Sequence, residues 1–245
     1  MTDSTSIAPT AVTANLSSAE GIDLSQFEQV RTEVQAWQTS HGTQVRFVEA
    51  RQLPMIDLIV LFNAGTSVDA EHSGLAALTM YMLDEGTERL NAEQFAEQTE
   101  RLGAILSTQI RLEHASLSLR CLSSEVMLAQ AVALFTEMLA RPAFDEQQLV
   151  KVKQQLRAFQ SSRYNAAPTR AQSELFSRLY AGHPYAAPLG STEQGIQALT
   201  AQDLRDFHQR AYSANNLQVS IVGDLSRAQA EALVEQLAEA LPQGW

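Results

Sequence analysis

The chain has 245 residues, of which 45% are hydrophobic, and it carries a formal net charge of -11 at pH 7. This length and apolar fraction suffice to bury a substantial core, in one large domain or two small ones. The acidic charge disfavours nucleic acid or an anionic membrane surface as a partner, because both would repel the chain. A single cysteine, Cys121, excludes an intrachain disulfide and a cysteine-based zinc site. No apolar run approaches the roughly 20 residues that span a bilayer.

Residues 1–32 differ in composition from the rest of the chain. Thr, Ser and Ala dominate up to Ser18, with Pro9 among them and no periodic apolar pattern. Such a sequence cannot offset the entropy lost on ordering, so we predict a flexible leader. It lacks the basic start and the apolar core of a signal peptide. The folded domain is therefore expected to comprise residues 33–245.

Five strands are predicted, over residues 45–49, 55–64, 104–110, 113–121 and 217–222. The second is so continuously apolar that it should lie in the centre of its sheet. The fourth alternates with a period of two, which predicts one buried and one solvated face. Its inward residues would be Ala115, Leu117, Leu119 and Cys121.

Helices are predicted between these strands from their capping signals. Asn91 should begin one that Gly103 ends, Ser123 or Ser124 another that Pro142 ends, and Asp145 a long one. Two further starts have the spacing of capping boxes, at Thr200-x-x-Asp203 and Ser226-x-x-Gln229. The segment after Gly74 is apolar on nearly every side, which indicates a buried helix. Strands followed by paired helices predict an α+β fold, with helices on one face of a mostly antiparallel sheet.

The segment 74–87, GLAALTMYMLDEGT, carries the clearest resemblance. It resembles the signature helix of the pitrilysin/insulinase family of zinc metallopeptidases, which includes the mitochondrial processing peptidases and typically reads GLAHFLEHMLFKGT around an inverted His-x-x-Glu-His zinc motif. Scaffold motifs such as His183-Pro184-Tyr185 and Val222-Gly223-Asp224 extend the resemblance over about residues 33–242. The resemblance implies the same α+β domain that the patterns predict.

The residues that do chemistry in that family are replaced here. Its two histidines, which bind Zn²⁺, fall on Ala77 and Tyr81, and its glutamate, the general base, falls on Met80. The third ligand falls near Ala158, and residues 147–173 contain no Asp, Glu, His or Cys. The resemblance therefore implies an inactive-subunit type, with no catalytic residue, no metal and no cofactor, although zinc is usual for the family. His72, His114 and His183 are interpreted as surface or turn residues rather than ligands.

The resemblance also suggests partners. Full-length family members carry two such domains, and this sequence stops where the first domain's last helix ends, so we expect an N-terminal half without the second domain. Inactive subunits pair with a homologous zinc-bearing subunit and help to hold extended peptide. Many bacterial relatives are periplasmic, but without a signal peptide in the sequence a cytoplasmic location stays open.

The strand after Gly103 is the predicted peptide-binding edge, because it mixes apolar and hydroxyl residues without proline or charge. The residues concerned are Ile105, Leu106, Ser107, Thr108 and Gln109. The alternative is an interior strand with both neighbours filled. Two other functions stay open at this point: a zinc metalloendopeptidase with a non-standard site, and a purely structural domain.

Overall fold

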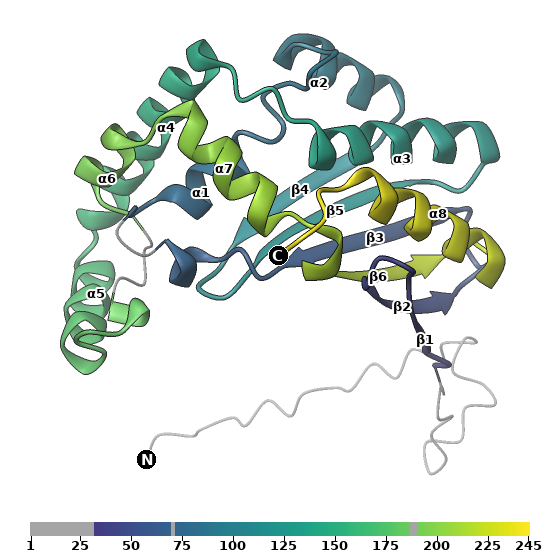
Figure 1. The fold of residues 1–245 in the computed structure, drawn as a ribbon, viewed down its shortest axis with the longest axis horizontal. Coiled ribbons are helices and arrows are strands. Elements are labelled where there is room, and N and C mark those ends of the chain that lie inside the picture. The colour runs from purple at the N-terminus through teal and green to yellow at the C-terminus, as the bar shows by residue number, and fades with distance from the viewer. Residues whose placement is uncertain (1–31, 70–71, 187–190) are drawn as a thin grey trace, which may run out of the picture. The chain divides into compact units, whose positions relative to one another are not determined.

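The computed structural model of the chain describes residues 32–69, 72–186 and 191–245 (Figure 1). The predicted leader, apart from Thr32, lies outside the described residues. Within them the strands form one six-stranded sheet in the order β1-β2-β6-β3-β5-β4. Their bounds are β1 (Gln35–Gln38), β2 (Gln44–Glu49), β3 (Met55–Phe62), β4 (Ile105–Ile110), β5 (Ala115–Leu122) and β6 (Leu217–Gly223).

Every neighbouring pair of strands is antiparallel except β2 and β6, which run parallel. The apolar strand β3 lies between β5 and β6, which confirms its predicted central position. In β5 the four residues predicted to face inward are all buried, and they alternate with more exposed neighbours. The mostly antiparallel sheet of the sequence analysis is therefore confirmed.

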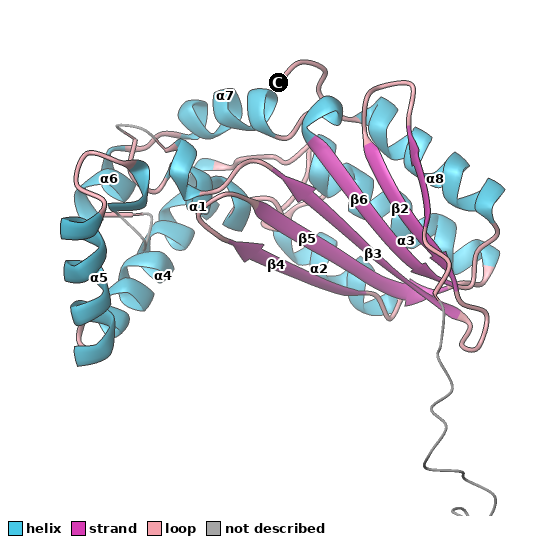
Figure 2. Ribbon diagram, turned by 90° about the horizontal axis from the view of Figure 1, so that it is seen from below, coloured by secondary structure: helices cyan, strands magenta, loops and turns pink. Residues whose placement is uncertain are grey.

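Eight helices accompany the sheet in the described part of the chain. They are α1 (Leu75–Tyr81), α2 (Ala92–Arg101), α3 (Glu125–Ala140), α4 (Glu146–Tyr164), α5 (Ala167–Leu179), α6 (Glu193–Ala198), α7 (Ala201–Ala211) and α8 (Arg227–Ala240), with short 3-10 turns η2 (Thr66–Val68), η3 (Pro184–Ala186) and η4 (Ala214–Asn216). The helices α2, α3 and α8 cover one face of the sheet (Figure 2). The helix α1 packs against α4, α6 and α7 beside one end of the sheet.

The predicted helix starts are found where the capping residues placed them. Asn91 and Gln94 form a reciprocal capping box at α2, as do Thr200 with Asp203 at α7. Ser226 and Gln229 form the third box, at α8. The core fills the space between the helix layer and the inward side chains of the sheet, where Phe47, Phe62 and Phe135 are fully buried. None of the helices in the described segments combines the length and the apolar character needed to cross a membrane.

Candidate functional site

The helix α1 begins at Gly74, whose φ of 96° lies in the left-handed region. A Cβ at this position would come within 3.0 Å of Ile196 Cγ1 and of Ser191 Cβ. Both the backbone conformation and the close approach of α6 therefore require glycine. This explains why the segment 74–87, which resembles the family's signature helix, starts with glycine.

A buried carboxylate, Asp69, holds the first turn of α1. Its two oxygens accept hydrogen bonds from the backbone N–H groups of Gly74 at 2.8 Å and Ala76 at 2.7 Å. Burial raises the pKa of Asp69 to about 6, and the two N–H donors act in the opposite direction. The residue satisfies two donors that the helix itself cannot use. No local pattern in the sequence predicts this contact, because Asp69 lies five residues before Gly74.

Three of the four positions that the resemblance assigns to a zinc site lie together on α1. Ala77 is 6% exposed and Met80 is 0% exposed, whereas Tyr81 is half-buried against the core. A methyl group, a thioether and a phenol occupy these positions. None of them resembles the imidazole and carboxylate donors that Zn²⁺ prefers in proteins.

The fourth position, Ala158, lies elsewhere. It is exposed on α4, whereas the face of α4 turned towards Tyr81 carries Val152, Gln155, Leu156 and Phe159. These four residues recur at helical spacing, and together with Tyr81 they line a hollow of about 340 Å³. Counting along the sequence placed the equivalent position at Ala158, but helical periodicity turns Gln155 and Phe159 to this hollow instead. An amide and a phenyl ring do not complete a zinc site either, so the residues present do not fit the metal.

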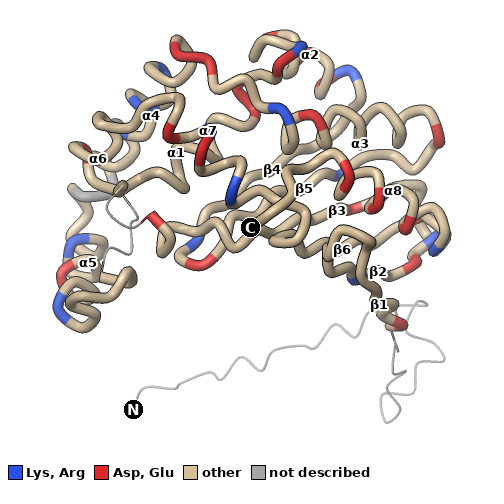
Figure 3. Tube along the Cα trace, viewed as in Figure 1, with Lys and Arg blue, Asp and Glu red and all other residues tan. Residues whose placement is uncertain are grey.

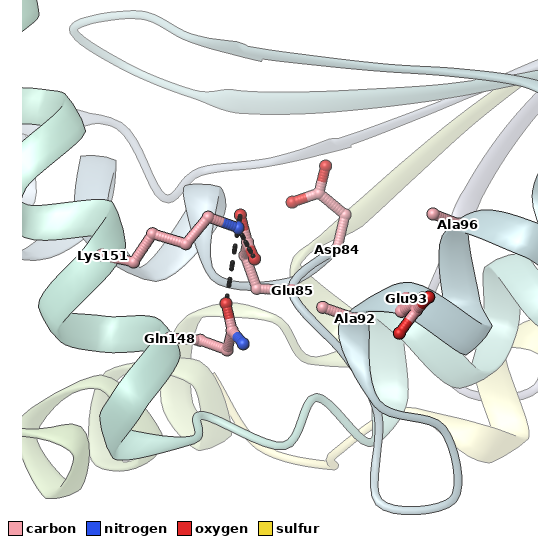
Figure 4. A pocket seen from close by; sticks show the side chains of 7 residues that line it. All are labelled: Asp84, Glu85, Ala92, Glu93, Ala96, Gln148 and Lys151. Carbon is pink, nitrogen blue, oxygen red and sulfur yellow. Dashed lines mark hydrogen bonds and ion pairs between the residues drawn. The ribbon is translucent and has the colours of Figure 1, made fainter.

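A second hollow of about 430 Å³ adjoins the first, between α4 and α2. Figure 4 shows Lys151 extending from α4 towards Glu85, with Glu93 on the neighbouring helix. The ammonium group of Lys151 lies 3.0 Å from Glu85 Oε2 and 3.5 Å from Gln148 Oε1. Asp84 and Glu85 line both hollows. The described residues contain no group of three His, Cys, Asp or Glu side chains arranged to hold a metal ion.

The three histidines weighed in the sequence analysis are not brought to this site. His72 is exposed before α1, and His114 is half-buried just before β5. His183 lies in the turn that leads into η3, where its ring packs edge-on against Tyr185 with centroids 4.6 Å apart. These positions agree with surface and turn roles.

The predicted peptide-binding strand, β4, lies at the edge of the sheet. Within the described residues it pairs with β5 alone, and it contacts both α1 and α2. The alternative of an interior strand is therefore wrong for the described part of the fold. The edge runs beside the helix that carries Ala77, Met80 and Tyr81.

Two models of known protein families match this chain. The family model for insulinase (peptidase family M16) matches residues 48–193, and the model for the peptidase M16 inactive domain matches residues 198–245. The first match alone covers more than half of the sequence. The chain therefore belongs to peptidase family M16, which confirms the resemblance to the pitrilysin/insulinase family.

Individual relatives agree with this assignment. The chain is 29% identical over 201 residues to the non-peptidase homolog YmxG of Helicobacter pylori, a match that covers 82% of this chain and 46% of that protein. It is 23% identical over 202 residues to bovine cytochrome b-c1 complex subunit 1, covering 80% of this chain and 41% of that protein. The chain thus spans about half the length of the curated relatives that it matches.

Solved structures show the same fold. A crystal structure of a peptidase M16 inactive domain from Pseudomonas fluorescens superimposes with a TM-score of 0.84 at 40% identity, covering 86% of this chain and 52% of that one. Pitrilysin superimposes with a TM-score of 0.75 at 18% identity, covering 88% of this chain and 24% of pitrilysin. The second likeness concerns the fold alone.

Proposed function

We propose that this domain is a non-catalytic member of peptidase family M16 that binds an extended segment of polypeptide along the free edge of β4. The segment belongs either to a peptide or to a homologous, zinc-bearing subunit with which the domain forms a heterodimer. One observation carries the proposal: β4, which pairs only with β5 among the described residues, lies against the helix that has Ala77, Met80 and Tyr81 at the expected zinc-site positions. Relatives described as a non-peptidase homolog and as an inactive domain support it.

The hydrogen-bond pattern identifies which residues of β4 are available. Arg111 N–H donates to His114 O at 2.8 Å at the hairpin end of β4 and β5. Bonded and non-bonded pairs alternate in an antiparallel ladder, so Ser107 pairs with Ser118 through hydrogen bonds. The main-chain groups of Leu106, Thr108 and Ile110 then point away from β5, towards the free edge. An added strand would bond to these groups through its backbone, without requiring a particular side chain.

This alternation supplies a matched pair of proline variants. Thr108→Pro removes an N–H at the free edge, whereas Ser107→Pro removes an N–H that bonds to β5. We expect Thr108→Pro to keep the fold and to weaken binding of a fluorescein-labelled unstructured peptide, measured by anisotropy. We expect Ser107→Pro to lower the melting temperature. A Thr108→Pro variant that binds the peptide as tightly as the wild type contradicts the edge as the binding site.

The non-catalytic part of the proposal has a separate test. Ala77, Met80 and Tyr81 provide neither zinc ligands nor a general base, so calorimetric titration with Zn²⁺ should give no stoichiometric binding at α1. The purified chain alone should also leave an unstructured peptide intact. Zinc that survives dialysis, together with cleavage that a chelator abolishes, would favour the alternative of a metalloendopeptidase with a non-standard site.

A further inference from the structure

A third hollow lies in the helix layer between α2 and α3, and none of its lining residues belongs to α1 or β4. Its volume is about 460 Å³, within the range of roughly 300–1,000 Å³ that is usual for ligand sites. Its apolar lining comes from Leu102 beside α2 and from Met127 and Leu134 on α3. Ala133 leaves room between these larger side chains, and Met127 can adapt its shape to a bound group.

The negative charge in this groove is already neutralised. The carboxylate of Glu137, which is 7% exposed, accepts hydrogen bonds from Arg89 Nε at 2.9 Å and from Thr87 Oγ1 at 2.7 Å. It also forms an ion pair with Arg89 Nη2. These donors hold the pKa of Glu137 below its usual value, so the carboxylate stays ionised and paired. The side chain of Arg89 nevertheless remains 72% exposed at this end of the groove.

A second guanidinium group, that of Arg101, is exposed to solvent. Arg101 lines the groove from the last turn of α2, and it makes no ion pair or hydrogen bond with any other residue in the described part of the chain. Acidic and basic residues are otherwise interspersed over the helices (Figure 3). A groove with an apolar floor and two exposed guanidinium groups is thus present on a chain whose net charge is -11.

We propose that this groove docks a segment of a partner protein that presents an apolar side chain next to a carboxylate. The apolar side chain would occupy the space above Ala133, between Leu134 and Met127. The carboxylate would pair with Arg101, whose planar guanidinium group matches it with two parallel hydrogen bonds. The net charge of the chain argues against a polyanion such as nucleic acid, because two arginines cannot offset the repulsion.

The test uses a fluorescein-labelled peptide of about 15 residues in which leucines at helical spacing lie next to glutamates, and a matched peptide with lysine in place of glutamate. Both peptides are titrated into the Thr108→Pro variant, so that binding along the edge of β4 does not contribute. We expect the glutamate peptide to bind this variant and the lysine peptide not to bind it, by anisotropy. Arg101→Glu should weaken binding roughly tenfold or more, because it replaces an attractive pair by a repulsive one. Ala133→Trp should weaken it similarly by filling the groove.

Arg178→Glu is the control, since it makes the same charge change on α5 at a side chain that is 80% exposed. Added to the Thr108→Pro background, it should leave the affinity for the glutamate peptide unchanged. If Ala133→Trp fails to fold, Arg101→Glu, at an exposed position, still tests whether the groove binds the glutamate peptide. In the Thr108→Pro background, equal binding with and without Arg101→Glu overturns the proposal, as does equal binding of the lysine peptide or equal competition by oligothymidylate.

Discussion

The ring of His208 stacks on the ring of Tyr212, with centroids 5.3 Å apart and an interplanar angle of 19°. Both residues are buried, but only one of the two has a hydrogen-bond partner for its polar group. His208 Nε2 lies 2.8 Å from Leu139 O, within hydrogen-bonding distance, whereas the hydroxyl of Tyr212 has no partner among the described residues. A single stacked pair at the end of α7 therefore contains one satisfied and one unsatisfied polar group.

The first prediction concerns that hydroxyl. Burying a polar group without a hydrogen bond costs about 1–3 kcal/mol, so Tyr212→Phe should raise the free energy of unfolding by about 1 kcal/mol. Urea denaturation followed by circular dichroism measures the change. Tyr185→Phe is the control, because its hydroxyl donates to Glu113 on the surface. A clear loss of stability in Tyr212→Phe would mean that the hydroxyl has an acceptor.

The second prediction is a pH dependence that His208 causes. Burial lowers the pKa of His208 to about 4, against about 6.5 in an unfolded chain. Between these values the unfolded state binds the proton more tightly, so this contribution to stability is lost as the pH falls from 6.5 to 4. The loss is roughly 3 kcal/mol. The variant His208→Gln keeps an N–H donor for Leu139 O but does not titrate. Its stability relative to the wild type should therefore increase as the pH falls through this window.

The third prediction has the opposite sign and concerns Asp69. Its folded pKa of about 6 lies above the unfolded value of about 3.9, so protonation favours the folded state. This contribution therefore increases as the pH falls from 6 to 4, and it partly cancels that of His208. Relative to the wild type, Asp69→Asn should become less stable on acidification through this window, by chemical denaturation at several pH values. A difference that does not change with pH would contradict the raised pKa.

The fourth prediction tests the geometry of the lost site by rebuilding it. The variant Ala77→His, Met80→Glu, Tyr81→His supplies the α1 part of the family motif, and a third ligand can be added at either of two positions on α4. Adding Gln155→Glu should give roughly tenfold or more tighter Zn²⁺ binding in calorimetry than adding Ala158→Glu. Of these two positions, Gln155 lines the hollow beside Tyr81 and Ala158 does not. Tighter Zn²⁺ binding with Ala158→Glu would show that position 158, rather than position 155, faces the side chains on α1. Both variants should be less stable than the wild type, since Met80 is fully buried.

Local patterns predicted most of the secondary structure because their physical causes are local. The capping boxes at Asn91, Thr200 and Ser226 satisfy backbone donors within the first turn, and the alternation in β5 follows from the pleat alone. The helix after Gly74 was predicted from its apolar side chains and from the resemblance to the family's signature helix. The carboxylate that holds the start of this helix, Asp69, was missed, because its contact depends on how the preceding loop folds back.

Residue types at fixed spacings were enough to predict the family, the order of most strands and helices, and the side chains at the zinc-site positions of α1. The short strand β1 and the helices α5 and α6 were not predicted. The three-dimensional structure was needed to show that β4 is an edge strand, that α4 turns Gln155 rather than Ala158 to the hollow beside Tyr81, and that Arg89 and Arg101 share a groove with Leu134. The physical reason is the same in each case. Strand order, helix rotation and the meeting of two helices depend on packing between segments far apart in the chain, which local periodicity does not encode.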